Sequence, residues 1–387
     1  MRHYNTIFSQ VLDLIPRHQF ETIVKRHKAD RYVKYFSCWQ QFITLLFAQI
    51  RSKDSLRDIE TSLRTHTNKW YHLGLKDIRR STLCDANKNR NYKIYEQLFY
   101  KILQRCTDIT PRHRFKFKNP LYTLDSTVID LCLSLYPWAK FRKTKVALKI
   151  HNLYDHRGCM PVFITVTDAK QHDVKIARRL NLPLVSDSIL CVDRAYIDYK
   201  WLYTLNKSKL YFVTRAKKNI NYKITGQHEV KKKKGILFDY IIKLSGYYQS
   251  SYYPKNLRLV GFYDTSTKKQ LVFLTNNFVL SAYTIAKVYK TRWEIEIFFK
   301  WIKQNLKIKS FLGTSKNAVL TQIWVAMCYY LLLSYIKYQT KYSYSLTEFA
   351  IMLKETVFET ISLIDLLGCT HYTCYRAREP DLQLALL

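Results

Sequence analysis

The chain has 387 residues, 48% of them apolar, so it is long enough for several domains with a substantial core and too apolar for a disordered protein. It carries 64 Lys and Arg against 29 Asp and Glu, a formal net charge of +35 that is spread along the whole chain. A folded protein this basic is expected to bind a polyanion, with nucleic acid as the leading partner. The alternatives are an anionic membrane surface and a compositional bias toward Lys, Asn, Ile and Tyr.

Residues 1–110 are expected to form a helical domain. Apolar residues recur at spacings of three and four, the pattern of helices that bury one face, and short polar links separate the repeats. The segments with this pattern are 8–15, 18–27, 39–50 and 55–64. The N-terminal stretch MRHYNTIFSQVLDLIP lacks the apolar run of a signal peptide, so no secretion signal is expected.

A polar and basic segment, IRRSTLCDANKNRNYKIY, follows in the same region, with Ser81 as the expected N-cap of a helix. A short helix, a tight turn and a polar-basic helix are what a helix-turn-helix protein uses to place side chains in a major groove. The residues expected to contact DNA here are Arg79, Arg80, Asn87, Lys88 and Arg90. The alternative is a plain helical bundle with a solvated basic face.

The pattern changes within residues 111–217. A basic linker bounded by prolines, PRHRFKFKNP, leads into β-branched and apolar runs that alternate with short helical segments. Strands are expected at 121–133, 146–155, 159–168, 188–196 and 209–217, and helices at 173–180 and 201–209. This order is typical of an α/β layer with a central mixed sheet.

Residues 218–280 are expected to be β-rich, because apolar runs are separated by Gly, Ser, Asp and Lys turns. These runs lie at 235–244, 257–264 and 270–277. Four lysines at 231–234 fall in one of the loops. They are read as solvated, with DNA contact as the alternative.

The final part of the chain, 281–340 and a C-terminal segment 341–387, is expected to be helical. The apolar stretch 318–336 is nearly long enough to span a bilayer. It stands alone and contains hydroxyl and amide side chains, so we expect a buried core helix.

Nine cysteines are dispersed without Cys-x-x-Cys spacing, which indicates reduced thiols in a cytosolic protein. Cys369, His371 and Cys374 have no second ligand cluster, so they are a weak zinc candidate.

Two aspartates interrupt apolar runs that are expected to be neighbouring strands. Asp125 lies within LDSTVID, and Asp193 ends the run ILCV. Either one alone is more often a turn or cap residue. Two carboxylates held close together repel each other, and a divalent cation makes such an arrangement stable. Oxygen ligands of this kind select Mg²⁺ or Mn²⁺.

The stretch YKTRWEIEIFFKWIKQNL contains two glutamates that a helix separates. At a helical rotation of about 100° per residue, one polar stripe holds Tyr289, Arg292, Glu296, Lys300 and Lys303. Glu294 falls on the far side, so Glu294→Gln is expected to do little. The stripe can complete a metal site with a carboxylate and hold phosphates with its cations. The alternative is an ordinary salt-bridged face, because Arg292 and Glu296 are four residues apart.

These residues resemble a known family. The Y-x2-R-x3-E-x6-K spacing of residues 289–303 matches the Y-R-E-K signature of the IS-four family of bacterial insertion-sequence transposases. The segments around Asp125 and Asp193 resemble the family's two catalytic aspartates, and TDAKQHDVK and FVTRAK resemble two further blocks. The N-terminal region resembles the domain that precedes the catalytic core in a Bacteroides-like branch. One departure is Ala195, where the family usually has Gly.

The resemblance implies a ribonuclease H-like fold with a β-rich insertion between the second aspartate and the glutamate. It implies two-metal phosphoryl transfer with two Mg²⁺ or Mn²⁺ ions on Asp125, Asp193 and Glu296. The residues it implies for holding DNA phosphates are Tyr289, Arg292, Lys300 and Lys303.

The sequence therefore predicts a DNA transposase that cuts at its element's inverted repeats and joins the ends to a target. The expected partners are double-stranded DNA and a second copy of the chain in a synaptic dimer, with no membrane, in the bacterial cytoplasm at the nucleoid. The alternatives are a DNA-binding protein without catalysis and a metal-dependent nuclease that does not perform strand transfer.

Overall fold

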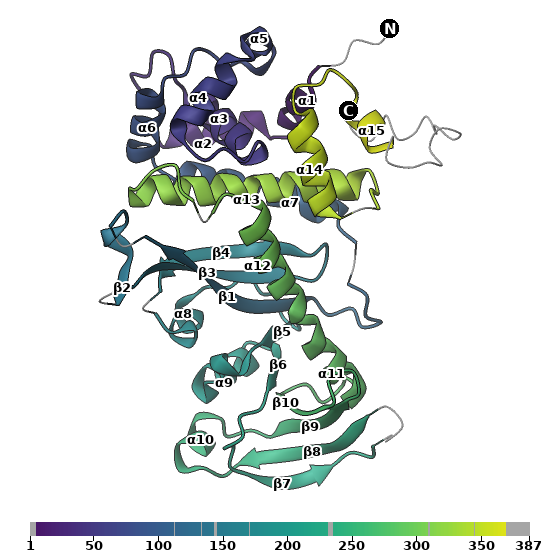
Figure 1. Ribbon diagram of the computed structural model, residues 1–387. Coiled ribbons are helices and arrows are strands. Elements are labelled where there is room, and N and C mark those ends of the chain that lie inside the picture. The colour runs from purple at the N-terminus through teal and green to yellow at the C-terminus, as the bar shows by residue number, and fades with distance from the viewer. Residues whose placement is uncertain are drawn as a thin grey trace. The chain divides into compact units, whose positions relative to one another are not determined.

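The computed structural model describes residues 5–368 except 112, 133, 143–144, 170, 231–234, 309 and 344 (Figure 1). The lysine run and the Cys369–Cys374 segment lie outside the described residues. The chain forms two compact units. The helical unit comprises Met1–Thr110, Leu131–Trp138 and Lys300–Leu387, and the sheet unit comprises Pro111–Asp130 and Ala139–Phe299. The chain thus returns at Lys300 to the unit in which it began, ahead of the boundary expected at residue 340.

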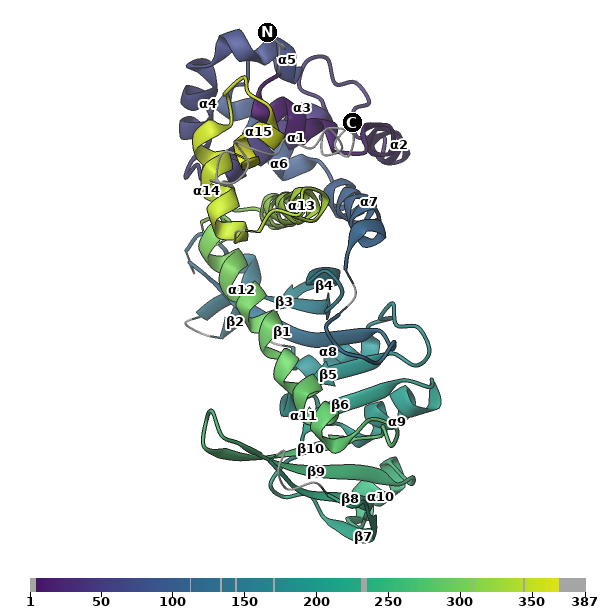
Figure 2. The ribbon, with the colours of Figure 1, turned by 90° about the vertical axis from the view of Figure 1, so that its right-hand side faces the viewer.

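The helical unit is built around one apolar helix. Its helices are α1 (Ile7–Asp13), α2 (Arg17–Arg26), α3 (Cys38–Ile50), α4 (Leu56–Arg64), α5 (Trp70–Leu73), α6 (Arg80–Asn89), α7 (Lys93–Ile109), α13 (Lys316–Gln339), α14 (Leu346–Thr356) and α15 (Leu363–Gly368). The four N-terminal helices predicted from apolar spacing are confirmed. α13 lies side by side with α7 (Figure 2), where the rings of Phe99 and Trp324 have centroids 5.3 Å apart.

α13 is long and apolar enough to cross a membrane, but 94% of its most apolar window is buried inside the protein. Two of its polar side chains, Asn317 and Gln322, have hydrogen-bond partners within the unit. Gln322, for example, accepts the backbone N–H of Leu312 at 2.8 Å and donates to the carbonyl of Ser310 at 3.1 Å. This helix is therefore a core element, as the sequence predicts.

The sheet unit holds one ten-stranded sheet. Its strands are β1 (Leu121–Leu131), β2 (Lys140–Arg142), β3 (Lys145–Asp155), β4 (Met160–Asp168), β5 (Ile189–Val192), β6 (Tyr211–Arg215), β7 (Tyr222–Gln227), β8 (Ile236–Leu244), β9 (Leu257–Asp264) and β10 (Lys269–Thr275). The strand order is β2-β3-β1-β5-β6-β10-β9-β8-β7, and β4 also pairs with β3. β1, β5 and β6 are parallel to one another, whereas β10 pairs antiparallel with β6. The β-rich segment expected at 218–280 therefore extends the central sheet.

Helices cover both faces of the central strands. The helices of this unit are α8 (Asp173–Arg179), α9 (Tyr199–Lys207), α10 (Tyr247–Tyr252), α11 (Ala282–Thr291) and the first part of α12 (Trp293–Asn305). Leu121, Ile189 and Val213 pack with α11 on one face, and Leu190 and Phe212 pack with α9 on the other. Alternation of side chains along each strand explains why neighbouring residues face opposite helices. Burial on both faces explains the unbroken apolar run of β5.

Candidate active site

The register of three parallel strands brings the two predicted aspartates together. Leu124 of β1 pairs with Val192 of β5, which pairs in turn with Thr214 of β6. The next residue along each strand is Asp125, Asp193 and Arg215, respectively. Asp125, Asp193 and Arg215 therefore lie at the same level along three neighbouring strands, each one residue beyond a paired position.

The junction of α11 and α12 directs further side chains at this point. α11 ends at Thr291 and α12 begins at Trp293, and Arg292 between them has helical dihedral angles (φ −52°, ψ −29°). The helical phase is therefore carried across the junction. The hydroxyl of Tyr289 donates to Asp193 Oδ1 at 3.4 Å.

Arg292 is the central link of the cluster. Its guanidinium contacts Asp125 Oδ2 at 3.1 Å and Glu296 Oε1 at 2.7 Å. The second contact is the i,i+4 ion pair that the sequence offered as an alternative reading. The first contact reaches a different strand, which an ordinary surface pair does not do, and the Arg292 side chain is only 10% exposed.

Burial and mutual repulsion shape the protonation of these groups. Burial raises the pKa of Asp125 to about 6, with Asp193 and Glu296 adding to the rise and Arg292 and the Ser126 N–H opposing it. Burial also raises the pKa of Tyr289 to about 12. Burial disfavours the charge of Arg292, but Tyr289, Glu296 and Asp125 outweigh it and raise the pKa of that guanidinium. Arg292 therefore stays charged and offsets part of the carboxylate repulsion.

The donor set of this cluster fits a hard divalent cation. Asp125, Asp193 and Glu296 offer only carboxylate oxygens, which Mg²⁺ and Mn²⁺ prefer. Arg292 lies between two of these carboxylates. Among the described residues, no three His, Cys, Asp or Glu side chains are placed to hold one ion together. The charge interactions of Asp125 with Asp193 and Glu296 nevertheless mark an acidic site that a cation would stabilise.

A polar network supports β1 beside Asp125. The Ser126 N–H donates to Asp125 Oδ1 at 2.8 Å, and the Ser126 hydroxyl donates to Asp173 Oδ1 at 2.6 Å. Asp173, in the first turn of α8, also pairs with Lys149 at 3.0 Å. The TDAKQHDVK block thus supplies a carboxylate that orients the strand carrying Asp125.

Glu294 occupies a different environment from Glu296. Its Oε2 accepts a hydrogen bond from His156 Nδ1 at 2.9 Å, and His156 Nε2 lies 2.7 Å from the hydroxyl of Thr123. Burial opposes ionisation of Glu294, but the contacts with His156 lower the pKa of that carboxyl. Glu294 is therefore turned away from the aspartates, as the helical phase predicts, and joins α12 to β1 through His156.

Sequence reasoning missed Arg215 and His156. The FVTRAK block contains the only signal for Arg215, and it became informative once the pairing of β5 with β6 was known. His156 had no signal of its own, because its partners Thr123 and Glu294 are 33 and 138 residues away along the chain.

The predicted DNA-contacting residues are in different environments. Tyr289 and Arg292 are buried within the carboxylate cluster. Lys300 and Lys303 lie on α12 beyond residue 299, Lys300 exposed and Lys303 half-buried. Arg79, Arg80 and Lys88 are exposed.

The prediction that α6 exposes Asn87 is wrong. Asn87 is 3% exposed, and its side chain accepts a hydrogen bond from Gln41 Nε2 at 2.8 Å. Arg90 is half-buried and donates to Gln41 Oε1 at 3.2 Å and to the backbone carbonyl of Phe36. Both side chains therefore hold the helical unit together.

The start of α6 also differs from the expected helix-turn-helix. α6 begins at Arg80, one residue before the predicted N-cap Ser81. The preceding helix α5 ends at Leu73, and residues 74–79 join the two. This link is longer than the tight turn that the motif requires.

Comparison with known proteins gives matches to two family models and to one solved structure. Residues 116–332 match the family model described as "Transposase DDE domain", and residues 3–76 match a "Domain of unknown function (DUF4372)". Among solved structures, a piggyBac transposase synaptic complex with hairpin DNA aligns with 97% of this chain and 86% of its own, at a TM-score of 0.47 and 11% identity.

Three curated relatives carry transposase names. A putative transposase y4zB of Sinorhizobium fredii is 33% identical over 256 residues, 65% of this chain and 69% of its own. The probable transposase for element IS5377 of Geobacillus stearothermophilus is 30% identical over 270 residues, which cover 69% of this chain and 70% of its own. The putative transposase for element IS4SA of a Synechocystis strain is 24% identical over 285 residues, which cover 71% of this chain and 76% of its own. The DDE domain match covers more than half of the chain, and with these relatives it shows that the chain belongs to the DDE transposases of bacterial insertion sequences.

Proposed function

We propose that this DDE transposase binds the ends of its insertion sequence, cleaves strands there and transfers them to target DNA, with Asp125, Asp193 and Glu296 as the catalytic carboxylates. The observation that carries the proposal is that Arg292 contacts both Asp125 and Glu296, while Asp193 follows the same position on the strand beside Asp125 and accepts from Tyr289. A structural ion pair requires two partners, whereas this cluster gathers three carboxylates.

The proposed fold of the catalytic core is ribonuclease H-like. This assignment is supported by the parallel strands β1, β5 and β6. It is also supported by β3, which lies beside β1 and pairs antiparallel with β4. The β-rich segment between Asp193 and Glu296 extends the sheet beyond β6.

Asp125, Asp193 and Glu296 would hold two Mg²⁺ or Mn²⁺ ions, which would activate a water or a DNA 3′-hydroxyl as the nucleophile and stabilise the leaving 3′-oxygen. Arg292 holds Asp125 and Glu296 in one orientation. Tyr289 orients Asp193 through its hydroxyl. Lys300 and Lys303 bind phosphates of the cleaved strand, as does the guanidinium of Arg292.

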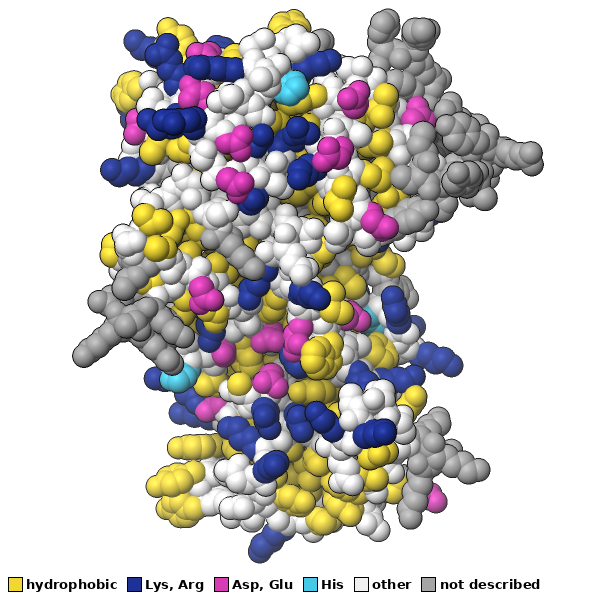
Figure 3. Space-filling view, in the orientation of Figure 1, with side chains coloured by type: hydrophobic (Ala, Val, Ile, Leu, Met, Phe, Trp, Pro, Cys, Tyr) yellow, Lys and Arg dark blue, Asp and Glu magenta, His cyan; other side chains and the backbone are white. Residues whose placement is uncertain are grey.

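The charge distribution supports a DNA substrate. In Figure 3, acidic side chains gather on the exposed face of the sheet unit and Lys and Arg side chains border them. Phosphates would lie on the cations while the scissile bond faces the carboxylates. The working partners in this proposal are terminal inverted repeats, target DNA and a second protomer, with the bacterial cytoplasm as the place of action.

One reaction mixture tests the proposal against its alternatives. It contains the protein, terminal-repeat DNA, Mg²⁺ and a target plasmid, and the products are separated on a denaturing gel. Nicked ends and joined products are expected. Bound DNA without any cut product would refute catalysis, and cut DNA that is never joined would favour a nuclease without strand transfer.

A further inference from the structure

The loop between α2 and α3 displays aromatic and basic side chains that the core does not use. Tyr32 is 85% exposed and Tyr35 is 75% exposed, although tyrosines usually bury most of their ring. Lys28, Arg31 and Lys34 alternate with them and are exposed. We name residues 28–35 the α2–α3 loop.

The exposed charged side chains of this loop are all basic. Its single acid, Asp30, is half-buried and accepts a hydrogen bond from the backbone N–H of Cys38 at 2.8 Å. The guanidinium of Arg90 lies 4.0 Å from the same carboxylate oxygen. The guanidinium of Arg31 lies 4.9 Å from the ring of Tyr32. The loop therefore offers cations and aromatic faces together, which is the combination that binds nucleic acid.

The loop backbone is held in place. Short hydrogen-bonded turns close within it, from Arg31 N–H to the Lys28 carbonyl at 3.2 Å and from Val33 N–H to the Asp30 carbonyl at 3.1 Å. Lys28 and Tyr32 have φ of +50° and +63°, a region that side-chain-bearing residues rarely adopt. Two residues of the loop are therefore held in the left-handed region, and one of them is the exposed Tyr32.

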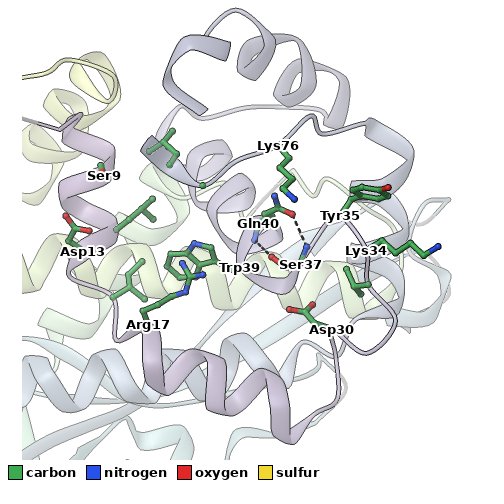
Figure 4. Close-up of a pocket in the computed structure, with 15 residues that line it drawn as sticks. Ser9, Asp13, Arg17, Asp30, Lys34, Tyr35, Ser37, Trp39, Gln40 and Lys76 are labelled. Carbon is green, nitrogen blue, oxygen red and sulfur yellow. Dashed lines mark hydrogen bonds between the residues drawn. The ribbon is translucent and has the colours of Figure 1, made fainter. Parts of the chain in front are cut away.

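Hollows lie on both sides of the loop. One, of about 530 Å³, has Arg17, Lys34 and Lys76 in its wall together with Asp13 and Asp30. The other, of about 710 Å³, has Lys28, Lys34 and Arg90 together with Asp85. Figure 4 shows Lys34 and Tyr35 at the rim of the first hollow, with Lys76 near them and Arg17 against Trp39 on the opposite side. Tyr35 lines both hollows, so it stands on a ridge between them.

We propose that the α2–α3 loop is a duplex-DNA-binding ridge that enters a groove and places the two bordering phosphate backbones over the flanking hollows, whose walls hold more Lys and Arg than Asp. The proposal rests on the proposed function, because it concerns the DNA on which the enzyme acts. A groove between two rows of phosphates matches a ridge between two hollows in shape and in charge.

Two matched triple substitutions test the ridge. The loop variant is Lys28→Gln, Arg31→Gln and Lys34→Gln, and the control is Arg57→Gln, Lys93→Gln and Lys101→Gln, on α4 and α7. Each removes three exposed cations from the helical unit. Both are made in a Glu296→Gln background without divalent ions, so that binding is measured without cleavage.

The measurement is fluorescence anisotropy with a terminal-repeat duplex of about 30 base pairs, three helical turns, over a range of salt. The loop variant is expected to bind about 10- to 100-fold more weakly, with a salt slope smaller by about 2.7, because three phosphate contacts are lost. The control, which lacks three exposed cations outside the loop, is expected to stay within about threefold of its parent. Equal losses in the two variants, or loss only in the control, would overturn the ridge. So would unchanged duplex affinity of the loop variant, whatever it does to binding of anionic phospholipid vesicles.

The tyrosines are tested separately. Tyr32→Phe with Tyr35→Phe keeps both rings and should keep duplex affinity, whereas Tyr32→Ala with Tyr35→Ala should lower it at unchanged salt slope. Thermal unfolding of each variant checks that the helical unit is intact. If the Glu296→Gln parent itself fails to bind the duplex, the proposed function fails. If the parent binds and the loop variants match it, only the ridge fails.

Discussion

Truncating Glu294 should impair both stability and cleavage, although Glu294 does not face the aspartates. Glu294→Ala removes the acceptor for His156 Nδ1, and the imidazole is only 3% exposed. A buried donor left without a partner costs about 1–3 kcal/mol. The Glu294 side chain is itself 37% exposed, so water replaces part of the lost contact and we expect about 1–2 kcal/mol.

The effect on cleavage is expected because the Glu294–His156–Thr123 contacts join α12, which carries Glu296, to β1, which carries Asp125. Glu296 is two residues beyond Glu294 on α12, and Asp125 is two residues beyond Thr123 on β1. A neutral imidazole satisfies both contacts, donating from Nδ1 to Glu294 and accepting at Nε2 from the Thr123 hydroxyl. Loss of such a supporting group typically lowers activity about 10- to 100-fold.

The assay compares three variants by urea unfolding and by the rate of terminal-repeat cleavage. Glu294→Gln keeps an acceptor oxygen and should retain most of both properties. Glu355→Ala, an exposed glutamate on α14, should change the unfolding free energy by less than about 0.5 kcal/mol. Parental stability and parental cleavage in Glu294→Ala would refute the supporting role of the Glu294–His156–Thr123 contacts.

Three further outcomes follow from the structure. Glu296→Gln should abolish strand cleavage and leave end binding intact, as measured by gel analysis and anisotropy. Arg258→Met should cost about 3–5 kcal/mol in urea unfolding, because it leaves Asp239, at present 2.7 Å away and 4% exposed, buried without its partner. Burial lowers the pKa of His151 from 6.5 to about 4, so the neutral imidazole stabilises the fold above pH 6.5 and this contribution, about 3 kcal/mol, is lost as the pH falls toward 4. Unfolding measured at pH 7 and pH 4.5 should therefore show a smaller pH dependence in His151→Gln.

The pairing of Asp125 with Asp193 could be predicted because each interrupts a strong apolar run, and parallel neighbouring strands align their ends. The helical phase of residues 289–296 is also kept in the structure, because Arg292 has helical dihedral angles between two helices. Local periodicity is therefore sufficient to place a site residue when its position depends on the geometry of a single helix or strand.

Residues whose partners lie far along the chain could not be placed in this way. Asn87 seemed exposed because it is polar, yet its partner Gln41 is 46 residues earlier. Polar side chains are buried readily when a hydrogen-bond partner is provided, and no local pattern reports that partner. The link between α5 and α6 was misjudged for a similar reason, because loop length is weakly encoded by composition.

The helical unit draws on both ends of the chain, and this sets an order of events during synthesis. The apolar face of α7 has no α13 to pack against until the ribosome has translated the whole sheet unit, at about 5–20 residues per second. A chain that stops early, after a frameshift or a nonsense codon, would expose Phe99 and its neighbours to solvent. Such fragments should be degraded and should not persist as DNA-binding competitors, so damaged copies of the element would be poor inhibitors of intact ones.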